Sequence, residues 1–347
     1  LPQAHTLIRA FNALCRIAAP GLVFKSEAIV HPDEVVKYIS QEECQISYNP
    51  TLMALLWESL ATREVRLLTR SLSHRHKLPT NTAWVNYLRC HDDIGLGYDD
   101  ADIRLAGYEP RSHRKFLVDY FTGAYEGSPA RGQPFGRDEK SGDARISGSL
   151  ASLAGLEAAL EQNNEEAIHQ CIDLILLLHG MIMSFGGIPL LYYGDEIGML
   201  NDFSYMSDAE KAHDSRWIHR PTIDWDKAER RHQHGTPEQR LFDGISKMIA
   251  VRKGTPALAD FNNRELIATG NPHLFVFMRS NPFALSDHVL VVGNFDSAPQ
   301  SLTLSDLGNR GEFEYGQLRD LWSGEAPSLF KDQLVIPAYR FYWLANR

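Results

Sequence analysis

The chain has 347 residues, of which 44% are hydrophobic and 23% are charged, and its formal net charge is −9. This composition is typical of a globular protein with a sizeable core, and it excludes a disordered chain and a disulfide-stapled miniprotein. The acidic balance offers no electrostatic footprint for nucleic acid or for an anionic membrane, so we expect neither as a partner.

The first half of the sequence predicts helices and strands in alternation. Apolar residues recur at helical spacing over residues 3–18, and the short apolar run over residues 21–27 has the pattern of a buried parallel strand that ends at Glu27. The next predicted elements are a helix over 31–39, a weak strand over 44–48, a helix over 50–72 and a strand over 82–90.

The periodicity fails over residues 95–148, where Gly, Pro, Asp and Arg are frequent and one helix is expected over 111–122. Such a segment is too long for a passive connection. Helical signal returns over 165–185, and residues 188–193 predict a further strand. We interpret this alternation as βαβ units around a parallel sheet, in which polar residues at the strand ends carry the chemistry.

The last predicted helix covers residues 236–253 and opens with Thr-Pro-Glu-Gln, which supplies an N-cap and a proline at the first helical position. Beyond it, short strands separated by turn signals predict an antiparallel β domain that begins near residue 260. These strands are expected over residues 266–268, 274–278, 289–292, 301–304 and 334–336.

The four cysteines are widely spaced and form no CxxC pair, which argues against a zinc or redox site and predicts reduced thiols. No signal peptide is recognisable, so we expect a cytosolic location, with secretion left open. The longest apolar stretch, residues 172–185, contains Asp173 and His179 and is shorter than the roughly 20 residues of a membrane span. It predicts a buried helix.

Ionisable residues follow three predicted strands: Glu27, the triplet His91 to Asp93, and the pair Asp195 and Glu196. A single carboxylate at a strand end is more often salt-bridged than catalytic. Adjacent aspartates repel each other and need partners, and two carboxylates that face one cavity are the equipment of glycosidic-bond chemistry. Metal binding is the alternative, but the sequence has no DxDxDG loop and no His pair at metal-ligand spacing, so we predict no metal site. We interpret Asp195 and Glu196 as structural.

Three ordered segments carry a family resemblance: Phe24 to Val30, Asn86 to Gly95 and Gly187 to Gly198. They resemble motifs of the α-amylase superfamily, family 13 of the glycoside hydrolases, and within it those of the amylosucrases. The similarity extends along essentially the whole chain. It implies the C-terminal half of a (β/α)8 TIM barrel with an inserted loop subdomain, followed by an antiparallel β-sandwich domain.

The resemblance also implies domain boundaries. Residues 1–94 would form a partial barrel with strands five to seven, 95–150 the inserted subdomain, 151–259 the remainder of the barrel with strand eight, and 260–347 the β-sandwich. The nucleophilic Asp of the family, in a Gly-Phe-Arg-x-Asp context, does not occur in this sequence. We therefore expect a piece of a longer enzyme that is inactive and folds poorly by itself.

The activity that the resemblance implies is retaining glucosyl transfer from sucrose to an α-1,4-glucan acceptor, with release of fructose. Glu27 would be the general acid and base, and Asp92 would stabilise the transition state. His91 and Arg216 would bind the same glucosyl unit. No cofactor is implied, because the glycosidic bond of sucrose supplies the energy for transfer.

Further substrate-binding residues follow from the resemblance. Asp93 and Arg145 correspond to an acceptor-side pair, and a structural ion pair is the equally favoured alternative. Arg114 resembles a glucan-contacting residue, with a solvated helix face as the alternative. The residues implied at the leaving-fructosyl or acceptor subsite are Ile29, Val30 and Glu43. Two other functions stay open, a sucrose hydrolase of the same fold and an inactive carbohydrate-binding fragment.

Overall fold

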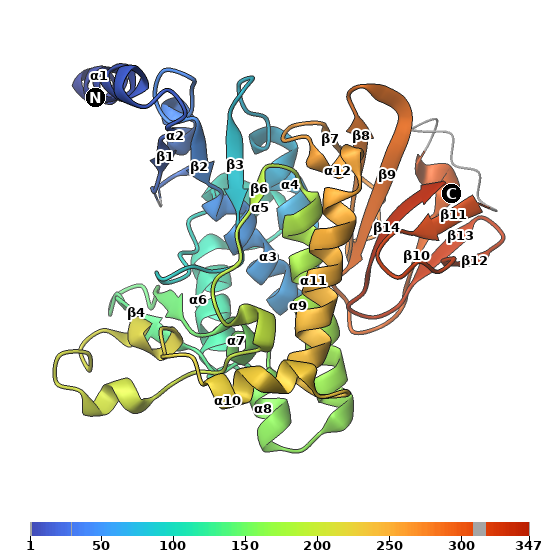
Figure 1. Cartoon of the computed structure of the whole chain (residues 1–347). Coiled ribbons are helices and arrows are strands. Elements are labelled where there is room, and N and C mark those ends of the chain that lie inside the picture. Colours follow the sequence, from blue (N-terminus) through green and yellow to red (C-terminus); the bar gives the residue numbers. More distant parts are fainter. Residues whose placement is uncertain (1, 29, 308–316, 347) are drawn as a thin grey trace.

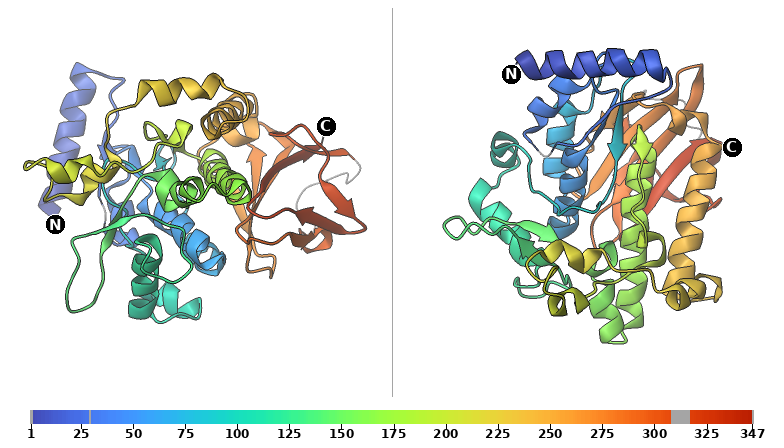
Figure 2. Two further views of the ribbon diagram at one scale, coloured as in Figure 1. Left: turned by 90° about the horizontal axis from the view of Figure 1, so that it is seen from below. Right: turned by 60° about the vertical axis from the view of Figure 1, so that its left-hand side comes forward.

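The computed structural model describes residues 2–28, 30–307 and 317–346, and two β-rich parts flank a pair of long helices (Figure 1). One part holds a parallel sheet, and the other holds antiparallel strands. Helices α9 (Glu165–Ser184) and α11 (Pro237–Lys253) pack against each other between the two parts. The N-terminal helix and the C-terminal strands lie on opposite sides of the molecule (Figures 1 and 2).

Four short strands form the parallel sheet in the order β1, β2, β3, β6. Each lies in a segment for which the sequence predicts a strand, and each is shorter than predicted. In the described part of the chain, β1 and β6 are the sheet edges, each with a strand partner on one side. The strands are β1 (Lys25–Ser26), β2 (Ile46–Tyr48), β3 (Ala83–Asn86) and β6 (Ile188–Pro189).

The helix predicted over residues 50–72 is in fact two helices, so this prediction was wrong. The break lies at Arg63, whose φ of 58° is left-handed. The backbone N–H of Val65 then donates to the carbonyl of Pro272, a contact with the β-sandwich that periodicity cannot reveal. The helices of this region are α1 (Pro2–Ala18), α2 (Pro32–Val35), η1 (Val36–Tyr38), α3 (Pro50–Thr62) and α4 (Arg66–Arg75).

The segment without periodicity contains a small β-hairpin that the sequence did not predict. An isolated antiparallel bridge between Ile94 and Ile146 ties this hairpin to the loop that follows β3. The hairpin therefore borders the predicted site. The elements here are α5 (Asp100–Leu105), α6 (Pro110–Phe121), β4 (Gln133–Phe135) and β5 (Arg145–Ser147).

Helix α9 passes the length and composition test for a membrane span, but 72% of its most apolar window is buried inside the molecule. It packs on α8, α11 and β9, which confirms the predicted buried helix. Thr236 caps α11 through its side-chain oxygen, also as predicted. The other helices are α7 (Leu150–Leu153), α8 (Leu156–Glu161), η2 (Asp195–Ile197), η3 (Ser204–Ser207), η4 (Ser215–His219), α10 (Trp225–Glu229), η5 (Arg230–His232) and α12 (Pro256–Ala259).

Within the described residues, the antiparallel strands that follow α12 form two sheets, β11-β14-β9-β8-β7 and β10-β13-β12. A buried apolar cluster joins Val276 and Leu290 of the larger sheet to Leu302 and Leu334 of the smaller one, as in a sandwich. The elements are β7 (Arg264–Ile267), β8 (Leu274–Asn281), β9 (Ala284–Asn294), β10 (Gln300–Thr303), η6 (Leu304–Leu307), β11 (Leu318–Asp320), β12 (Ser328–Phe330), β13 (Gln333–Ile336) and β14 (Phe341–Asn346).

Buried guanidinium groups join the sandwich to the C-terminal end of α9. Arg264 on β7 donates to the carbonyl of Phe185 at 3.0 Å, and Arg279 on β8 donates to the carbonyl of Ser184 at 2.5 Å. Arg252 of α11 donates to the carbonyl of Met183 at 2.9 Å. These carbonyls end the helix and carry the negative end of its dipole, so cations are favourable there.

Replacing Gly187 with Ala is expected to destabilise the chain by about 3 kcal/mol. Its φ is +81°, which costs a side chain about 1–2 kcal/mol, and a Cβ would also overlap the Trp84 carbonyl of β3. Gly270→Ala is the matched control, since Gly270 has a φ of +74° and no atom within 4 Å of a Cβ. Urea unfolding measures both, and equal losses would contradict the overlap argument.

Candidate active site

Glu27 immediately follows β1 and is close to half exposed, with 46% of its side chain accessible. Lys25 points to the same side of the strand, because residues two apart share a face. Its Nζ lies 3.8 Å from Glu27 Oε2 and 3.8 Å from the centroid of the Tyr48 ring. The acid is therefore open to solvent on one side and has a positioned cation on the other.

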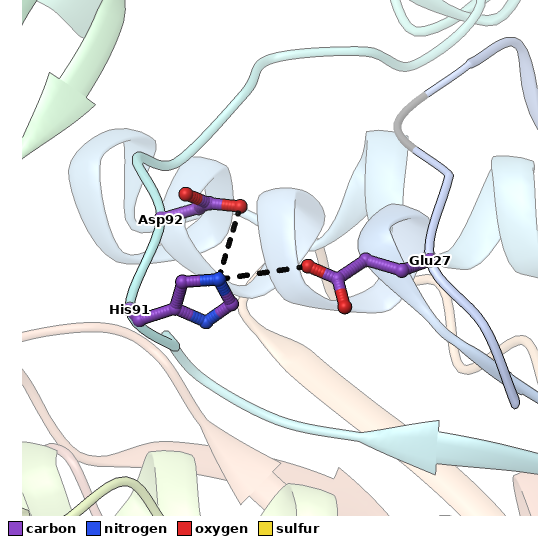
Figure 3. Close-up of side chains that lie close together, drawn as sticks. All are labelled: Glu27, His91 and Asp92. Atoms are coloured by element: carbon purple, nitrogen blue, oxygen red, sulfur yellow. Dashed lines mark ion pairs between the residues drawn. The ribbon is translucent and has the colours of Figure 1, made fainter.

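His91 and Asp92 lie in the loop after β3 and face Glu27 (Figure 3). His91 Nε2 lies 3.7 Å from Glu27 Oε1 and 3.5 Å from Asp92 Oδ2. The carboxyl ends of parallel strands meet at one edge of a sheet, and this topology brings together residues 64 positions apart in the sequence (91 − 27). The structure thus places the two predicted catalytic carboxylates and His91 together.

Two arginines hold the carboxylate of Asp92. Arg216 Nη1 donates to Asp92 Oδ1 at 3.0 Å, and Arg220 Nη2 lies 3.5 Å from the same oxygen. Arg216 also forms bonds of 2.8 to 3.2 Å with Asp214, and this pairing lowers the pKa of Asp214 and raises the pKa of Arg216. The charge of Asp92 is thereby compensated and its orientation fixed.

His219 and Arg220 converge on the main chain of the loop that follows β3. The His91 carbonyl lies 3.2 Å from His219 Nε2 and accepts from Arg220 Nε at 2.5 Å. His219 Nδ1 accepts from the N–H of Gly148 at 3.1 Å, so the ring proton is on Nε2 and His219 donates to His91. Burial, with help from the charge of Arg89, lowers the pKa of His219 to about 3.

We expect the His219 ring to stay neutral from pH 5 to pH 8. A lowered pKa means that the unfolded chain binds the proton more tightly, so this residue costs stability as the pH falls below about 6.5. Histidine NMR shifts recorded against pH measure the state directly. A titration midpoint of His219 above pH 5 would contradict the assigned hydrogen bonds.

Asp93 is buried beside Arg145, with 3.2 Å between Arg145 Nε and Asp93 Oδ2. Burial raises the pKa of Asp93, and the charge of Arg145 opposes that rise. Arg145 remains 49% exposed, and the guanidinium groups of Arg145 and Arg216 lie 4.8 and 4.7 Å from the centroid of the Phe135 ring. The pair of Asp93 and Arg145 therefore fastens the β4–β5 hairpin to the loop after β3. Arg145 and the Phe135 ring also place hydrogen-bond donors and an aromatic group beside Arg216, which holds Asp92.

The structure does not bring every predicted substrate-binding residue to this place. Glu43 is buried and bonds His5 at 2.9 Å and Arg9 at 2.8 Å, both on α1. It precedes β2, whereas Glu27 follows the parallel neighbour β1, so the two lie at opposite ends of the sheet. The structure thus gives Glu43 partners on α1 and does not bring it to Glu27, and its role at the acceptor subsite stays a prediction.

Arg114 is occupied by its own subdomain. It donates to the carbonyls of Leu96 and Tyr98 at 3.3 and 2.8 Å and pairs with Asp100 at 2.6 Å. These contacts explain Arg114 as an anchor of the inserted segment, and neither a glucan contact nor a solvated face is needed. Val30 is exposed near Glu27, and Ile29 lies outside the described residues.

The buried ion pair of Asp195 with Arg89 agrees with its structural interpretation, with 2.8 Å between Arg89 Nε and Asp195 Oδ1. Geometry alone would let Glu27, His91 and Asp92 hold a metal ion, because their ligand atoms lie within 4.8 Å of one another. The two guanidinium groups on Asp92 oppose a cation there. In the similar group of His31, Asp33 and Asp99, both aspartates already pair with the guanidinium of Arg75.

Sequence reasoning missed residues that shape the site. For three of them the signal was available in the segment His213 to Pro221, where acidic, basic and aromatic side chains alternate closely and several must share partners. It gave no indication of which of them would reach Asp92. The missed residues are Asp214, His219, Arg220 and the aromatic Phe135.

Comparison with known proteins extends these observations. Residues 264–343 match the C-terminal domain of maltogenic amylases. The trehalose synthase/amylase TreS of Mycolicibacterium smegmatis is 23% identical over 386 residues, which cover 100% of this chain and 57% of the relative. The chain is thus similar over its whole length to an enzyme described as a trehalose synthase and amylase. A second relative is the glucosylglycerate phosphorylase of Escherichia coli, 24% identical over 81% of the chain and 47% of the relative.

Solved structures agree on the fold. The α-amylase of H. orenii is 14% identical with a TM-score of 0.57, and the match covers 100% of this chain and 57% of that one. The cyclic α-maltosyl-(1→6)-maltose hydrolase of Arthrobacter globiformis is 18% identical with a TM-score of 0.56, over 99% and 54% of the chains. The chain thus spans about half the length of these relatives. The comparisons agree with the resemblance to α-amylase enzymes and do not support amylosucrase specifically.

Proposed function

We propose that the chain contributes the acid-base side of a retaining glucosyl-transfer site that takes glucose from sucrose and passes it to an α-1,4-glucan, as amylosucrases do. The observation that supports the proposal is the convergence of Glu27, His91 and Asp92 at the carboxyl ends of β1 and β3. Barrel enzymes carry their chemistry at that edge.

In the proposed reaction, Glu27 protonates the fructosyl oxygen as the glycosidic bond breaks and later takes a proton from the acceptor hydroxyl. Asp92, fixed by Arg216 and Arg220, binds the glucosyl hydroxyls and strengthens those bonds in the transition state. A nucleophilic carboxylate about 5–5.5 Å from Glu27 completes a retaining site. The proposal assigns that group to a part of the enzyme outside this sequence.

The acceptor side of the proposed site is the half-exposed Arg145, buried Asp93 and Phe135. An arginine with free donors beside an aromatic ring suits a sugar, whose hydroxyls accept hydrogen bonds and whose C–H face packs on the ring. This arrangement favours a sugar acceptor over water. The proposal includes no cofactor, because no step needs one.

Product analysis of a complete barrel that contains this chain tests the proposal. We expect fructose from sucrose in excess over free glucose, with the missing glucose recovered as α-1,4-glucan. Glucose and fructose in equal amounts would establish the hydrolase instead. Since two relatives are described as phosphorylases, a parallel reaction with phosphate is needed, and glucose 1-phosphate as the main product would replace the polymerase proposal.

A further inference from the structure

The peptide group between His91 and Asp92 is held at both of its polar ends. Its oxygen, the His91 carbonyl, lies 3.2 Å from the donor His219 Nε2 and accepts from Arg220 Nε at 2.5 Å. Its N–H, that of Asp92, donates to Cys90 Sγ at 3.5 Å. Because a peptide group is planar, contacts at its two ends fix the plane of the whole group. This peptide joins the two side chains that face the predicted general acid (Figure 3).

His219 is itself held by the loop that it holds. Arg89 precedes His91 in the loop after β3 and donates through Nη1 to the His219 carbonyl at 3.3 Å. The Arg89 guanidinium is fixed in turn by its buried ion pair with Asp195, at 2.8 Å. Arg89 therefore holds the main chain of His219, and the His219 ring holds the main chain of His91. Such a closed network of buried hydrogen bonds makes this part of the loop rigid.

The other ring nitrogen of His219 reaches the acceptor side of the candidate site. Nδ1 accepts from the N–H of Gly148 at 3.1 Å, and Gly148 directly follows β5, the strand that begins at Arg145. A neutral imidazole has one donor and one acceptor, so a single ring can make both contacts. His219 thus connects the hairpin that carries Arg145 to the loop that carries Asp92.

We propose that His219 is a positioning residue of the glucosyl-transfer site, which fixes the plane of the His91–Asp92 peptide group and thereby the directions of both side chains. The inference rests on the proposed function, in which Asp92 stabilises the transition state. Rotation of the peptide would move the Asp92 carboxylate relative to the sugar, and a displacement of about 1 Å can cost about 10²-fold in rate. His219 is only 2% exposed, so it acts through Asp92 and does not touch the substrate.

Two variants of His219, made in a complete barrel that contains this chain, separate the two ring contacts. In His219→Asn, the side-chain oxygen can replace Nδ1 and accept from Gly148, but no donor reaches the His91 carbonyl. In His219→Gln, the longer side chain brings an amide N–H to the place of Nε2. We expect kcat for fructose release from sucrose to fall about 30- to 100-fold in the Asn variant and less than about fivefold in the Gln variant, with KM changed less than about threefold in both.

The matched control is His179→Asn. His179 is also a buried histidine beside a main-chain acceptor, with 2.8 Å between its Nδ1 and the Ile175 carbonyl, but it lies within α9. Its replacement should lower the midpoint of urea unfolding, as His219→Asn does, and leave kcat within about twofold. Equal losses of kcat in the two Asn variants would overturn the positioning role.

Hydrogen exchange, measured on the same barrels without sugar, tests the fixed peptide plane apart from the reaction. The Asp92 amide should exchange at least about tenfold faster in His219→Asn than in the parent, and His219→Gln should restore slow exchange, while the amides of α9 and α11 stay unchanged. Unchanged exchange of the Asp92 amide in the Asn variant would overturn the proposal, as would an unchanged kcat. The expected exchange in a barrel that releases no fructose from sucrose would support the fixed peptide plane and count against the proposed function.

Discussion

Replacing Glu27 with Gln is expected to lower sucrose-dependent glucosyl transfer by roughly 10²–10⁴-fold in a complete barrel that contains this chain. Glutamine keeps the size of the side chain and its place after β1, and it removes the proton that the fructosyl oxygen needs. Because the acid acts in the transition state, the loss should appear in kcat more than in KM. Initial rates of fructose release over a range of sucrose concentrations measure both.

The matched control is Glu34→Gln, an exposed glutamate on α2 that pairs only with Lys37 among the contacts of its side chain in the described chain. It should change the rate by less than twofold. A donor with fluoride as its leaving group needs little protonation, so glucosyl fluoride should recover much of the first step in the Glu27 variant. Equal losses with sucrose and with glucosyl fluoride would assign Glu27 a structural role.

Replacing Arg89 with Met is expected to cost about 3–5 kcal/mol of folding free energy at pH 7, because it leaves the buried carboxylate of Asp195 without its partner. Arg89 also lies over the Tyr192 ring at 4.4 Å and donates to the His219 carbonyl at 3.3 Å. Urea unfolding measures the loss. The double variant Arg89→Met/Asp195→Asn should recover a large part of it, since neither charge then remains buried.

The same pair predicts a dependence on pH. Burial raises the pKa of Asp195 to about 6, although Arg89 opposes the rise. The folded state therefore holds this proton more tightly than the unfolded chain, and the stability that it contributes, on the order of 3 kcal/mol, is present below about pH 4 and lost by about pH 6. The cost of Arg89→Met should accordingly be smaller at pH 4 than at pH 7. An equal cost at both values would contradict a charged Asp195 in the variant.

Much of the fold could be predicted from local pattern. The capped start of α11, the buried α9 and the alternation of strands with helices all depend on residues close in sequence, where periodicity and capping operate. The break at Arg63 and the β4–β5 hairpin could not be predicted in this way. Their reasons are distant contacts, from Val65 to Pro272 and from Ile146 to Ile94.

The residues of the candidate site likewise fall into those that local sequence could predict and those that depend on distant contacts. Glu27, His91 and Asp92 could be expected to meet, because parallel strands align their carboxyl ends. Glu43 and Arg114 match the residue types that the family resemblance implies for substrate binding. In the structure, Glu43 bonds a residue of α1, and Arg114 bonds the inserted segment. The tertiary structure decides which acceptor a long polar side chain reaches. For the same reason, the hydrogen bond from Arg220 to the His91 carbonyl could not be predicted from the sequence.

The arginines at the end of α9 make the two halves of the molecule interdependent. Arg264 and Arg279 belong to the sandwich by sequence, yet the carbonyls they satisfy belong to a central helix of the other half. Separating the sandwich from the rest of the chain just before β7 would leave Arg264 and Arg279 without their acceptors. It would also leave the last carbonyls of α9 without these donors. Heating should therefore unfold both halves in one calorimetric transition, and the sandwich should not fold when it is expressed by itself.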